Sequence, residues 1–321
     1  MNIIGKAIWR SPSQTDIYYL ESGIGDDEFI IAPYQKNGSV QILKGQIKPL
    51  TETTAPNLFH SFQLAECPIV ISTTETHYLE MVNKAVETMQ SKQFEKVVLA
   101  RQLLVESALP VEKIFHALTK AYPNAFVYCF SLNNGLAMIG ATPETLLERK
   151  ADSLTTEALG GTEQSYGYTE KEYLEHQQII EDIRSKLKSQ HYTFEIGTTH
   201  PKKAGNVSHL STPISIVPQS LESDLNLIKQ LHPTAAIGGL PYESANAFIA
   251  SNEDFDRHYY AGYLGFKQNE AFSFYVNLRC AELYKNGAIL FAGAGINSNS
   301  IAADEWQETN NKLNTLRPYF N

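Results

Sequence analysis

One arginine stands in an apolar stretch near the end of the chain, where its charge needs a partner. Arg279 lies in NLRCAEL (277–283), whose alternating pattern predicts a β-strand. A charged side chain among apolar neighbours is costly unless it is paired, and a guanidinium binds carboxylates well. The sequence therefore predicts either an internal salt bridge or a binding site for a ligand that carries a carboxylate.

Two glutamates follow at the beginning of a predicted helix. Glu305 and Glu308 lie three residues apart in ADEWQETNNKL (303–313), shortly after the glycine-rich strand end ILFAGAGI (289–296). The N–H groups and dipole of a helix start attract acidic side chains, so local structure alone would explain this pair. The other candidate stretches favour a role in a site.

Three ionisable residues between positions 96 and 175 could also take part in chemistry. Lys96 heads the apolar strand EKVVLAR, and Glu144 follows a proline in GATPETLLE. Glu175 lies in the middle of the helical stretch KEYLEHQQIIEDI. The simpler explanations are a solvated strand end, a turn carboxylate and a helix surface, in that order.

Small residues mark two further stretches. A glycine pair precedes Thr162 in EALGGT (157–162), which indicates either a tight turn or a backbone that something approaches closely. The stretch LHPTAAIGGLP (231–241) is apolar and small. It suits either the wall of a ligand cavity or the end of a helix.

The elements that must position these residues mix helices and strands along the whole chain. Helical spacing covers 76–92, 111–123, 169–189 with Thr169 as its N-cap, 224–231, and a last helix from about 302. Strand patterns cover 94–106, hairpins over 125–142 and 145–159, and three strands within 262–295. The first 75 residues predict strands of an antiparallel sheet. The pattern favours one α+β domain over residues 1–321, with large antiparallel sheets covered by helices.

Composition narrows the functional class. The chain has 321 residues and a formal net charge of −9, so it is a poor non-specific binder of nucleic acid or of an anionic membrane. Its three cysteines form no Cys-x-x-Cys pair, and Cys129 and Cys280 lie in apolar runs, which predicts buried, reduced thiols. The sequence predicts neither a signal peptide nor a membrane span. We therefore expect a cytoplasmic protein that binds any anionic ligand through local cations.

Taken in order, these motifs resemble the chorismate-utilising enzymes, a family that includes anthranilate synthase component I and the aminodeoxychorismate, salicylate and isochorismate synthases. The resemblance begins near Leu79 and runs through KVVLAR, GATPETLL, GGT, KEYLEHQQIIEDI, HPTAAIGGLP, FDRHYYAGYLGF, NLRCAEL, FAGAGI and EWQETNNKL. It implies two packed, mostly antiparallel sheets flanked by helices. Residues 1–75 then form a shortened, β-rich N-terminal part of the same domain.

The resemblance also implies a metal site and a substrate site. In this family Mg²⁺ is held by glutamates that match Glu175 and Glu308, with Glu305 as an accompanying carboxylate. Mg²⁺ favours oxygen ligands and keeps several waters, which agrees with so few protein ligands. The ion would bridge an acidic protein to a dianionic substrate. The implied substrate-binding residues are Gly161, Thr162, His209, Ala236, Tyr260, Arg279, Gly293 and Gly295.

Within the family, a few positions resemble isochorismate synthases. Lys96 matches a lysine that acts as general base on water attacking C2 of chorismate, and Glu144 matches the general acid for the departing C4 hydroxyl. Glu144 should then have a raised pKa. Gly160 stands where some aminodeoxychorismate synthases carry a nucleophilic lysine, and Ala236, with Ile237 beside it, stands where ammonia-using enzymes and salicylate synthases usually carry threonine.

Two departures from the family pattern accompany these matches. EALGGT opens with Glu157 and Ala158 instead of the commoner proline-led version, and Tyr260 replaces a phenylalanine of some isochorismate synthases. The resemblance implies formation of isochorismate for menaquinone, siderophore or salicylate production. Salicylate synthase, anthranilate synthase component I and a catalytically inactive binding protein remain as alternatives. We expect no glutaminase subunit, and either a monomer or a weak homodimer.

Overall fold

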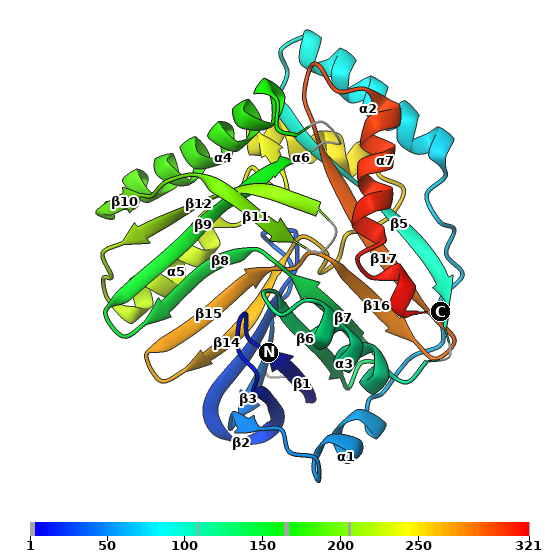
Figure 1. Ribbon diagram of the computed structural model, residues 1–321, viewed down its shortest axis with the longest axis vertical. Coiled ribbons are helices and arrows are strands. Elements are labelled where there is room, and N and C mark those ends of the chain that lie inside the picture. Colours follow the sequence, from blue (N-terminus) through cyan, green and yellow to red (C-terminus); the bar gives the residue numbers. More distant parts are fainter. Residues whose placement is uncertain (1–3, 108, 164–166, 205–206, 321) are drawn as a thin grey trace.

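Two antiparallel sheets packed face to face form the centre of the molecule (Figure 1). This computed structural model describes residues 4–107, 109–163, 167–204 and 207–320. The long strand β2 (Ile17–Ala32) belongs to both sheets: its first part pairs with β1, and its last part pairs with β14. The predicted α+β class with two antiparallel sheets is confirmed.

Sheet A follows the order β12–β9–β8–β15–β14–β2–β3, with β10 and β11 both on the outer edge of β12. Its further strands are β3 (Gln41–Gly45), β8 (Thr145–Lys150), β9 (Ser153–Thr162), β10 (Phe194–Ile196), β11 (His200–Ala204), β12 (Val207–Ile216), β14 (Tyr263–Gln268) and β15 (Ala271–Val276).

Sheet B follows the order β4–β2–β1–β6–β7–β16–β17–β5–β13. Its further strands are β1 (Gly5–Arg10), β4 (Lys48–Pro49), β5 (Lys96–Glu106), β6 (Phe126–Leu132), β7 (Ala137–Thr142), β13 (Gly239–Leu240), β16 (Cys280–Tyr284) and β17 (Gly287–Ile296). Because β1 and β2 pair with strands from the middle and end of the chain, the N-terminal part is built into both sheets.

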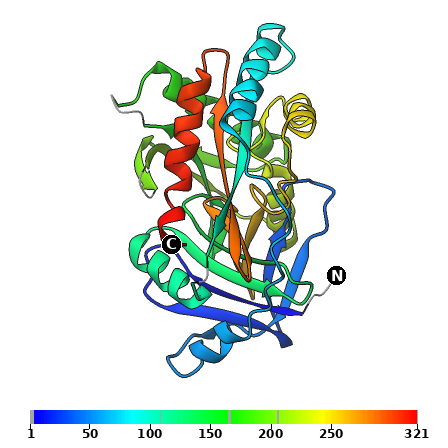
Figure 2. The ribbon, with the colours of Figure 1, turned by 90° about the vertical axis from the view of Figure 1, so that its right-hand side faces the viewer.

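Helices cover the outer faces of the sheets and close one end. In Figure 2, α7 and α2 lie side by side over β17 and β5, while α4 packs on β9 and β12 in Figure 1. None of the helices in the described residues is both long and apolar enough to span a bilayer. The helices are α1 (Ala55–His60), α2 (Glu75–Gln90), α3 (Val111–Ala121), α4 (Glu170–Ser189), α5 (Leu221–Leu231), α6 (Tyr242–Asn252), α7 (Ala302–Leu313) and the 3-10 turn η1 (Arg317–Tyr319).

Strand β6 shows why its sequence is apolar throughout. Its alternate residues Phe126, Tyr128 and Phe130 belong to the core between the sheets, whereas Val127 and Cys129 belong to a second core beneath α3. A strand covered on both faces has no polar side, so alternation disappears. Between the sheets, the rings of Phe126 and Tyr275 stack with centroids 4.2 Å apart.

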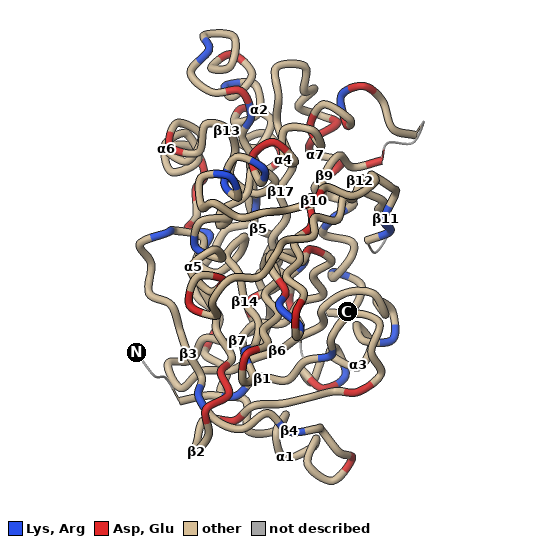
Figure 3. Tube along the Cα trace, turned by 90° about the vertical axis from the view of Figure 1, so that its left-hand side faces the viewer, with Lys and Arg blue, Asp and Glu red and all other residues tan. Residues whose placement is uncertain are grey.

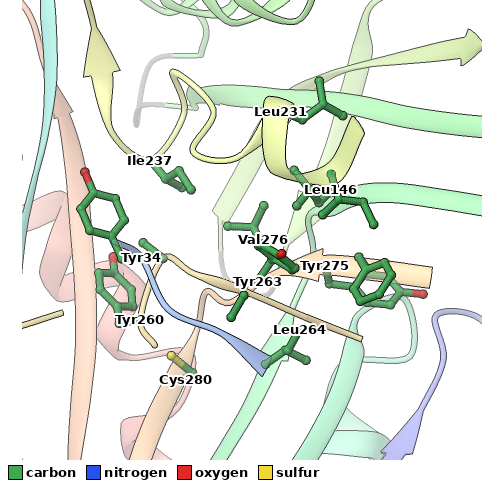
Figure 4. Packing of buried hydrophobic residues seen from close by; sticks show 14 of the residues in the cluster. Tyr34, Leu146, Leu231, Ile237, Tyr260, Tyr263, Leu264, Tyr275, Val276 and Cys280 are labelled. Carbon is green, nitrogen blue, oxygen red and sulfur yellow. The ribbon is translucent and has the colours of Figure 1, made fainter. Parts of the chain in front are cut away.

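The core between the sheets continues up to the wall of the main cavity. Figure 4 shows Tyr263, Tyr275 and Val276 from the β14–β15 hairpin packed in this cluster with Leu146 and Leu231. Ile237 and Tyr260 belong to the same cluster and also line the cavity. The site described below is therefore held by the main hydrophobic core.

The structure corrects three sequence predictions. The region 262–295 contains four strands, not three, because the break between β15 and β16 has no glycine or proline to mark it. The apolar runs DIYYLESG (16–23) and EFIIAPY (28–34), whose patterns predict two separate strands, form one strand, β2, with an irregularity in its pairing between Ser22 and Asp27. The first 75 residues are not all strands, since they contain α1. Cys129 and Cys280 are buried, as predicted.

Candidate active site

A cavity of about 710 Å³, measured out to its open mouth, lies where the ends of β5, β9, β12 and β17 meet helices α4 and α7. All the predicted site residues except Lys96 and Glu305 line it. The predicted residues on its wall are Glu144, Gly161, Thr162, Glu175, His209, Ala236, Tyr260, Arg279, Gly293, Gly295 and Glu308.

Glu144 and Arg279 enter the cavity from the two places where the chain crosses between the sheets. Glu144 lies between β7 of sheet B and β8 of sheet A, and Arg279 lies between β15 of sheet A and β16 of sheet B. Two backbone hydrogen bonds join the crossovers. The Val276 N–H donates to the Glu144 carbonyl at 3.0 Å, and the Ala141 N–H donates to the Arg279 carbonyl at 3.0 Å. Arg279 takes a left-handed conformation there, with φ of 48°.

A hydrogen-bonded chain of side chains runs along the cavity wall from Arg279 to Glu308. Arg279 Nη2 lies 3.2 Å from His209 Nε2, and because arginine can only donate, this ring nitrogen must accept. His209 Nδ1 then carries the hydrogen and lies 3.3 Å from the hydroxyl of Thr162. That hydroxyl donates to Glu308 at 3.0 Å. Burial, together with the charge of Arg279, holds the pKa of His209 well below its ordinary value, so the ring is neutral.

The guanidinium of Arg279 lacks an ionic partner in the described part of the chain. Its side chain is 7% exposed, no carboxylate lies within 4.0 Å, and Nη1 has no hydrogen-bond partner among those residues. Burial lowers the pKa of Arg279 to about 10, which still leaves it charged at neutral pH. Of the two explanations for this arginine, the structure favours a ligand carboxylate over an internal salt bridge.

Lys96 lies behind the cavity wall and is ion-paired with a residue on it. Its Nζ is 2.8 Å from Glu175 Oε1, and the lysine itself is 1% exposed. Glu175 projects from α4, whose start is fixed as predicted: the Thr169 N–H donates to the Glu172 carboxylate at 2.7 Å. The neighbouring His176 turns away from the cavity and lies 2.7 Å from the hydroxyl of Thr212.

Gly295 makes room for the Glu175 carboxylate. A Cβ at this position would lie 2.3 Å from Glu175 Oε1 and 3.4 Å from Lys96 Cε, which is too close for the carboxylate to keep its place. The resemblance implies that Gly295 takes part in substrate binding. The packing adds that its missing side chain lets Glu175 lie against β17.

We therefore expect Gly295→Ala to displace Glu175 without unfolding the protein. The far end of the glutamate can rotate away, so the free energy of unfolding should change by less than about 1 kcal/mol. Because the resemblance implies that Glu175 is a Mg²⁺ ligand, affinity for Mg²⁺ should fall by about tenfold or more, which is what positioning a ligand is worth. Thermal unfolding and calorimetric Mg²⁺ titration measure both effects, with Gly23→Ala, where a Cβ meets only one atom at 3.9 Å, as control. Unchanged Mg²⁺ affinity in Gly295→Ala would contradict this role.

Lys312 is a site residue that the sequence analysis missed. Its Nζ lies 2.6 Å from Glu308 Oε1 and donates to the carbonyl of Gly293 at 2.9 Å. Burial would raise the pKa of Glu308, but Lys312 and the other donors around it outweigh burial and lower that pKa. The spacing of four residues between Glu308 and Lys312 on one helix was the available signal.

Glu305 lies behind Glu308 and outside the cavity. It is 1% exposed and pairs with Lys171 at 2.9 Å. Burial, together with the neighbouring charge of Glu308, raises the pKa of Glu305 to about 7. Trp306 lies between them in sequence and packs elsewhere, under the guanidinium of Arg101 at 3.7 Å. Helix geometry thus places the two glutamates together and the tryptophan against the neighbouring α2.

The carboxylates of Glu175 and Glu308 are the type of ligand that a hard cation prefers. Glu175 and Glu308 both face the cavity and offer oxygen ligands, although each is paired with a lysine, and Figure 3 shows acidic and basic residues interspersed around α4 and α7. The described residues contain no group of three or more acidic, histidine or cysteine side chains arranged to hold a metal. Two carboxylates fit Mg²⁺ when substrate and water supply the other ligands.

Glu144 is buried at the cavity wall, with an exposed fraction of 4%. Burial, assisted by the negative charge of Glu157, raises the pKa of Glu144 to about 8, although Lys202, Lys96 and Lys312 oppose the rise. The carboxyl therefore carries a proton at neutral pH, in the direction predicted for a general acid.

Two glycines of β9 lie against helix α4 at the cavity wall. A Cβ at Gly160 would lie 2.2 Å from Ile179 Cδ1, and a Cβ at Gly161, which has φ of 71°, would lie 2.6 Å from the carbonyl oxygen of Glu172. The EALGGT stretch therefore allows α4 to approach β9 closely. Ala236 and Ile237 line the cavity, and Leu231 is the last residue of α5, so LHPTAAIGGLP is both a helix end and part of the cavity wall.

Comparisons with known proteins identify what this site resembles. A family described as "Chorismate binding enzyme" matches residues 35–320. Isochorismate synthase MenF of Haemophilus influenzae is 30% identical over 261 residues, covering 77% of this chain and 61% of the relative. MenF of Escherichia coli is 32% identical over 258 residues, covering 76% and 60%. The match thus spans about three fifths of the length of these curated relatives.

Solved structures share the fold. A putative 2,3-dihydroxybenzoate-specific isochorismate synthase, DhbC, from Bacillus anthracis has a TM-score of 0.83 at 22% identity, covering 98% of this chain and 96% of that chain. Anthranilate synthase component I from Streptococcus pneumoniae has a TM-score of 0.68 at 18% identity, covering 100% and 81%. At these identities the likeness establishes the fold alone.

Proposed function

Because this chain belongs to the family of chorismate-binding enzymes, we propose that it is an isochorismate synthase, which converts chorismate to isochorismate. The observation that carries the proposal is that a buried carboxyl with a raised pKa, Glu144, and the lysine Lys96 are held near the same cavity as Arg279, whose guanidinium has no ionic partner among the described residues. Addition of water and loss of a hydroxyl need a base and an acid in this way.

Arg279 would bind the enolpyruvyl carboxylate of chorismate. A guanidinium forms two parallel hydrogen bonds to a carboxylate, and Nη1 is free for such a contact in the described structure. Neutral His209 fixes the other side of the guanidinium through Nη2, so the arginine is oriented before substrate arrives.

The reaction would exchange one hydroxyl group for another. Water forms a bond to C2 and loses a proton to Lys96, the ring double bonds shift, and the C4–oxygen bond breaks. The C4 oxygen takes the proton from Glu144 and leaves as water. One water molecule enters and one leaves, so the overall reaction is an isomerisation. Lys96 must first be released from its ion pair with Glu175 and lose its own proton, since only the neutral amine can accept a proton from water.

Family members need a divalent metal ion, and we propose that it is Mg²⁺ held by Glu175 and Glu308, where it would supply positive charge for the ring carboxylate. Glu305 lies outside the cavity and would act on Glu308 or on bound water. Thr162 and Lys312 already orient Glu308 through hydrogen bonds at 3.0 and 2.6 Å.

The rival activities differ at named positions. Gly160 has no side chain that could act as the nucleophile of an aminodeoxychorismate synthase. Ala236 lines the cavity where a salicylate synthase would be expected to carry threonine. Ala236 and Lys96 also argue against anthranilate synthase component I. We further propose a cytoplasmic enzyme that acts without a glutaminase subunit. Menaquinone biosynthesis is the first candidate pathway and siderophore biosynthesis the second, in keeping with the names of the relatives.

Product analysis tests the proposal directly. Purified protein is incubated with chorismate and Mg²⁺, with and without EDTA, and a parallel sample contains ammonium. We expect isochorismate in both samples with Mg²⁺ and none with EDTA. Salicylate with pyruvate, or anthranilate only with ammonium, would assign the chain to another branch of the family. Chorismate that binds and stays unchanged would identify an inactive binding protein.

A further inference from the structure

A half-buried ion pair beside the cavity is not used by the reaction described above. Glu157 opens the EALGGT stretch on β9, and its side chain is 13% exposed. Lys202 of β11 lies 2.7 Å from its Oε2 and 2.9 Å from its Oε1, and the hydroxyl of Ser211 also donates to this carboxylate. Neither Glu157 nor Lys202 lines the cavity.

The same lysine reaches the backbone that carries Glu144. Lys202 Nζ donates to the carbonyl of Pro143 at 3.1 Å, and that carbonyl belongs to the peptide group leading into Glu144. One ammonium therefore joins the Glu157 carboxylate to the crossover from β7 to β8. In strand pairing, β8 and β9 form an antiparallel hairpin, which brings Glu157 alongside the beginning of β8.

We propose that Glu157 and Lys202 are a positioning pair for the general acid: the Glu157 carboxylate holds the ammonium of Lys202, and Lys202 in turn anchors the crossover that presents Glu144. This inference rests on the proposed isochorismate synthase function. It gives the departure from the proline-led family pattern at Glu157 and Ala158 a role, because a proline-led version would not place a carboxylate there.

Charges of both signs surround Glu144, so substituting either member of the pair changes the electrostatic surroundings of this carboxyl. After burial, Glu157 is the largest influence raising the pKa of Glu144, and the opposing lysines come from three other elements. Arg279, on the second crossover, also interacts electrostatically with Glu144. The ionised neighbours are Glu157 on β9, Lys202 on β11, Lys96 on β5, Lys312 on α7 and Arg279. Removing either member of the pair would leave the other unopposed.

The two members should therefore shift the pH profile in opposite directions. Activity should fall as pH rises and Glu144 loses its proton. In Glu157→Gln the unopposed ammonium of Lys202 favours the carboxylate, so the midpoint of this fall should move to lower pH by about one unit. In Lys202→Met the unopposed carboxylate of Glu157 should move it to higher pH. Lys202→Met should also lower kcat at every pH, because the anchor at Pro143 is lost.

The experiment measures kcat from about pH 5 to about pH 10. Thermal unfolding is measured for each variant to show that it is folded. Glu157→Asp, which keeps the charge, should restore a midpoint near that of the natural protein. Glu148→Gln, on the same hairpin and paired with Lys150, is the control and should leave the profile unchanged. Midpoints that stay fixed, or move the same way in both variants, would overturn the positioning pair. Failure of the natural protein to form isochorismate would instead overturn the proposed function.

Discussion

Replacing Lys96 by methionine should reduce turnover of chorismate by about 10²–10⁴-fold, the usual contribution of a general base. Lys96 is almost fully buried, and methionine has a similar length, so the substitution fills the space without leaving a cavity. The measurement is kcat with saturating chorismate and Mg²⁺, together with thermal unfolding to show that the variant is folded.

Binding measurements distinguish a base from a ligand. In the structure the amine of Lys96 is ion-paired with Glu175, so replacing the lysine leaves that carboxylate free. Affinity for Mg²⁺ should therefore stay the same or increase in Lys96→Met, while KM for chorismate changes little. Lys120→Met, an exposed lysine on α3, is the control for loss of a positive charge. A large rise in KM with little change in kcat would make Lys96 a substrate ligand instead of a base.

Local patterns predicted most of the elements. The helix over 169–189 was correctly placed from its N-cap, and the hairpins over 125–142 and 145–159 form β6–β7 and β8–β9. The pattern failed at the crossover between β15 and β16, where Asn277, Leu278 and Arg279 include neither glycine nor proline. This crossover is held by tertiary hydrogen bonds, such as that from the Ala141 N–H, which no local rule describes.

The site was predicted through its motifs, but its charge balance was not. Single residues such as Glu175 and Glu308 were found because they stand in recognisable stretches. The lysines that pair with these and other carboxylates are far away in sequence or one helical turn away. Lys96 lies 79 positions before Glu175, and Lys202 meets Glu157 only through sheet pairing. Which charges meet depends on register and topology, and sequence spacing records neither.

Arg279 should show the opposite of an ordinary core substitution: replacing it by methionine should raise stability and lower substrate affinity. The guanidinium is buried and lacks an ionic partner in the described structure, so its desolvation is not offset until a ligand carboxylate binds. Methionine has no charge to desolvate. The free energy of unfolding should therefore increase by about 1 kcal/mol or more, which raises Tm by about 2 °C.

The same substitution should raise KM for chorismate by about 10–100-fold, because a charge-assisted hydrogen bond to a carboxylate contributes about 1.5–3 kcal/mol. Thermal unfolding without ligand and initial rates with Mg²⁺ measure the two effects. Arg184→Met, at an exposed ion pair with Glu181, is the control and should change neither by much. A lower Tm with unchanged KM would show that Arg279 holds the fold together. A higher Tm with a raised KM would show that the protein keeps an unpaired buried charge, at a cost to its own stability, for the substrate's carboxylate.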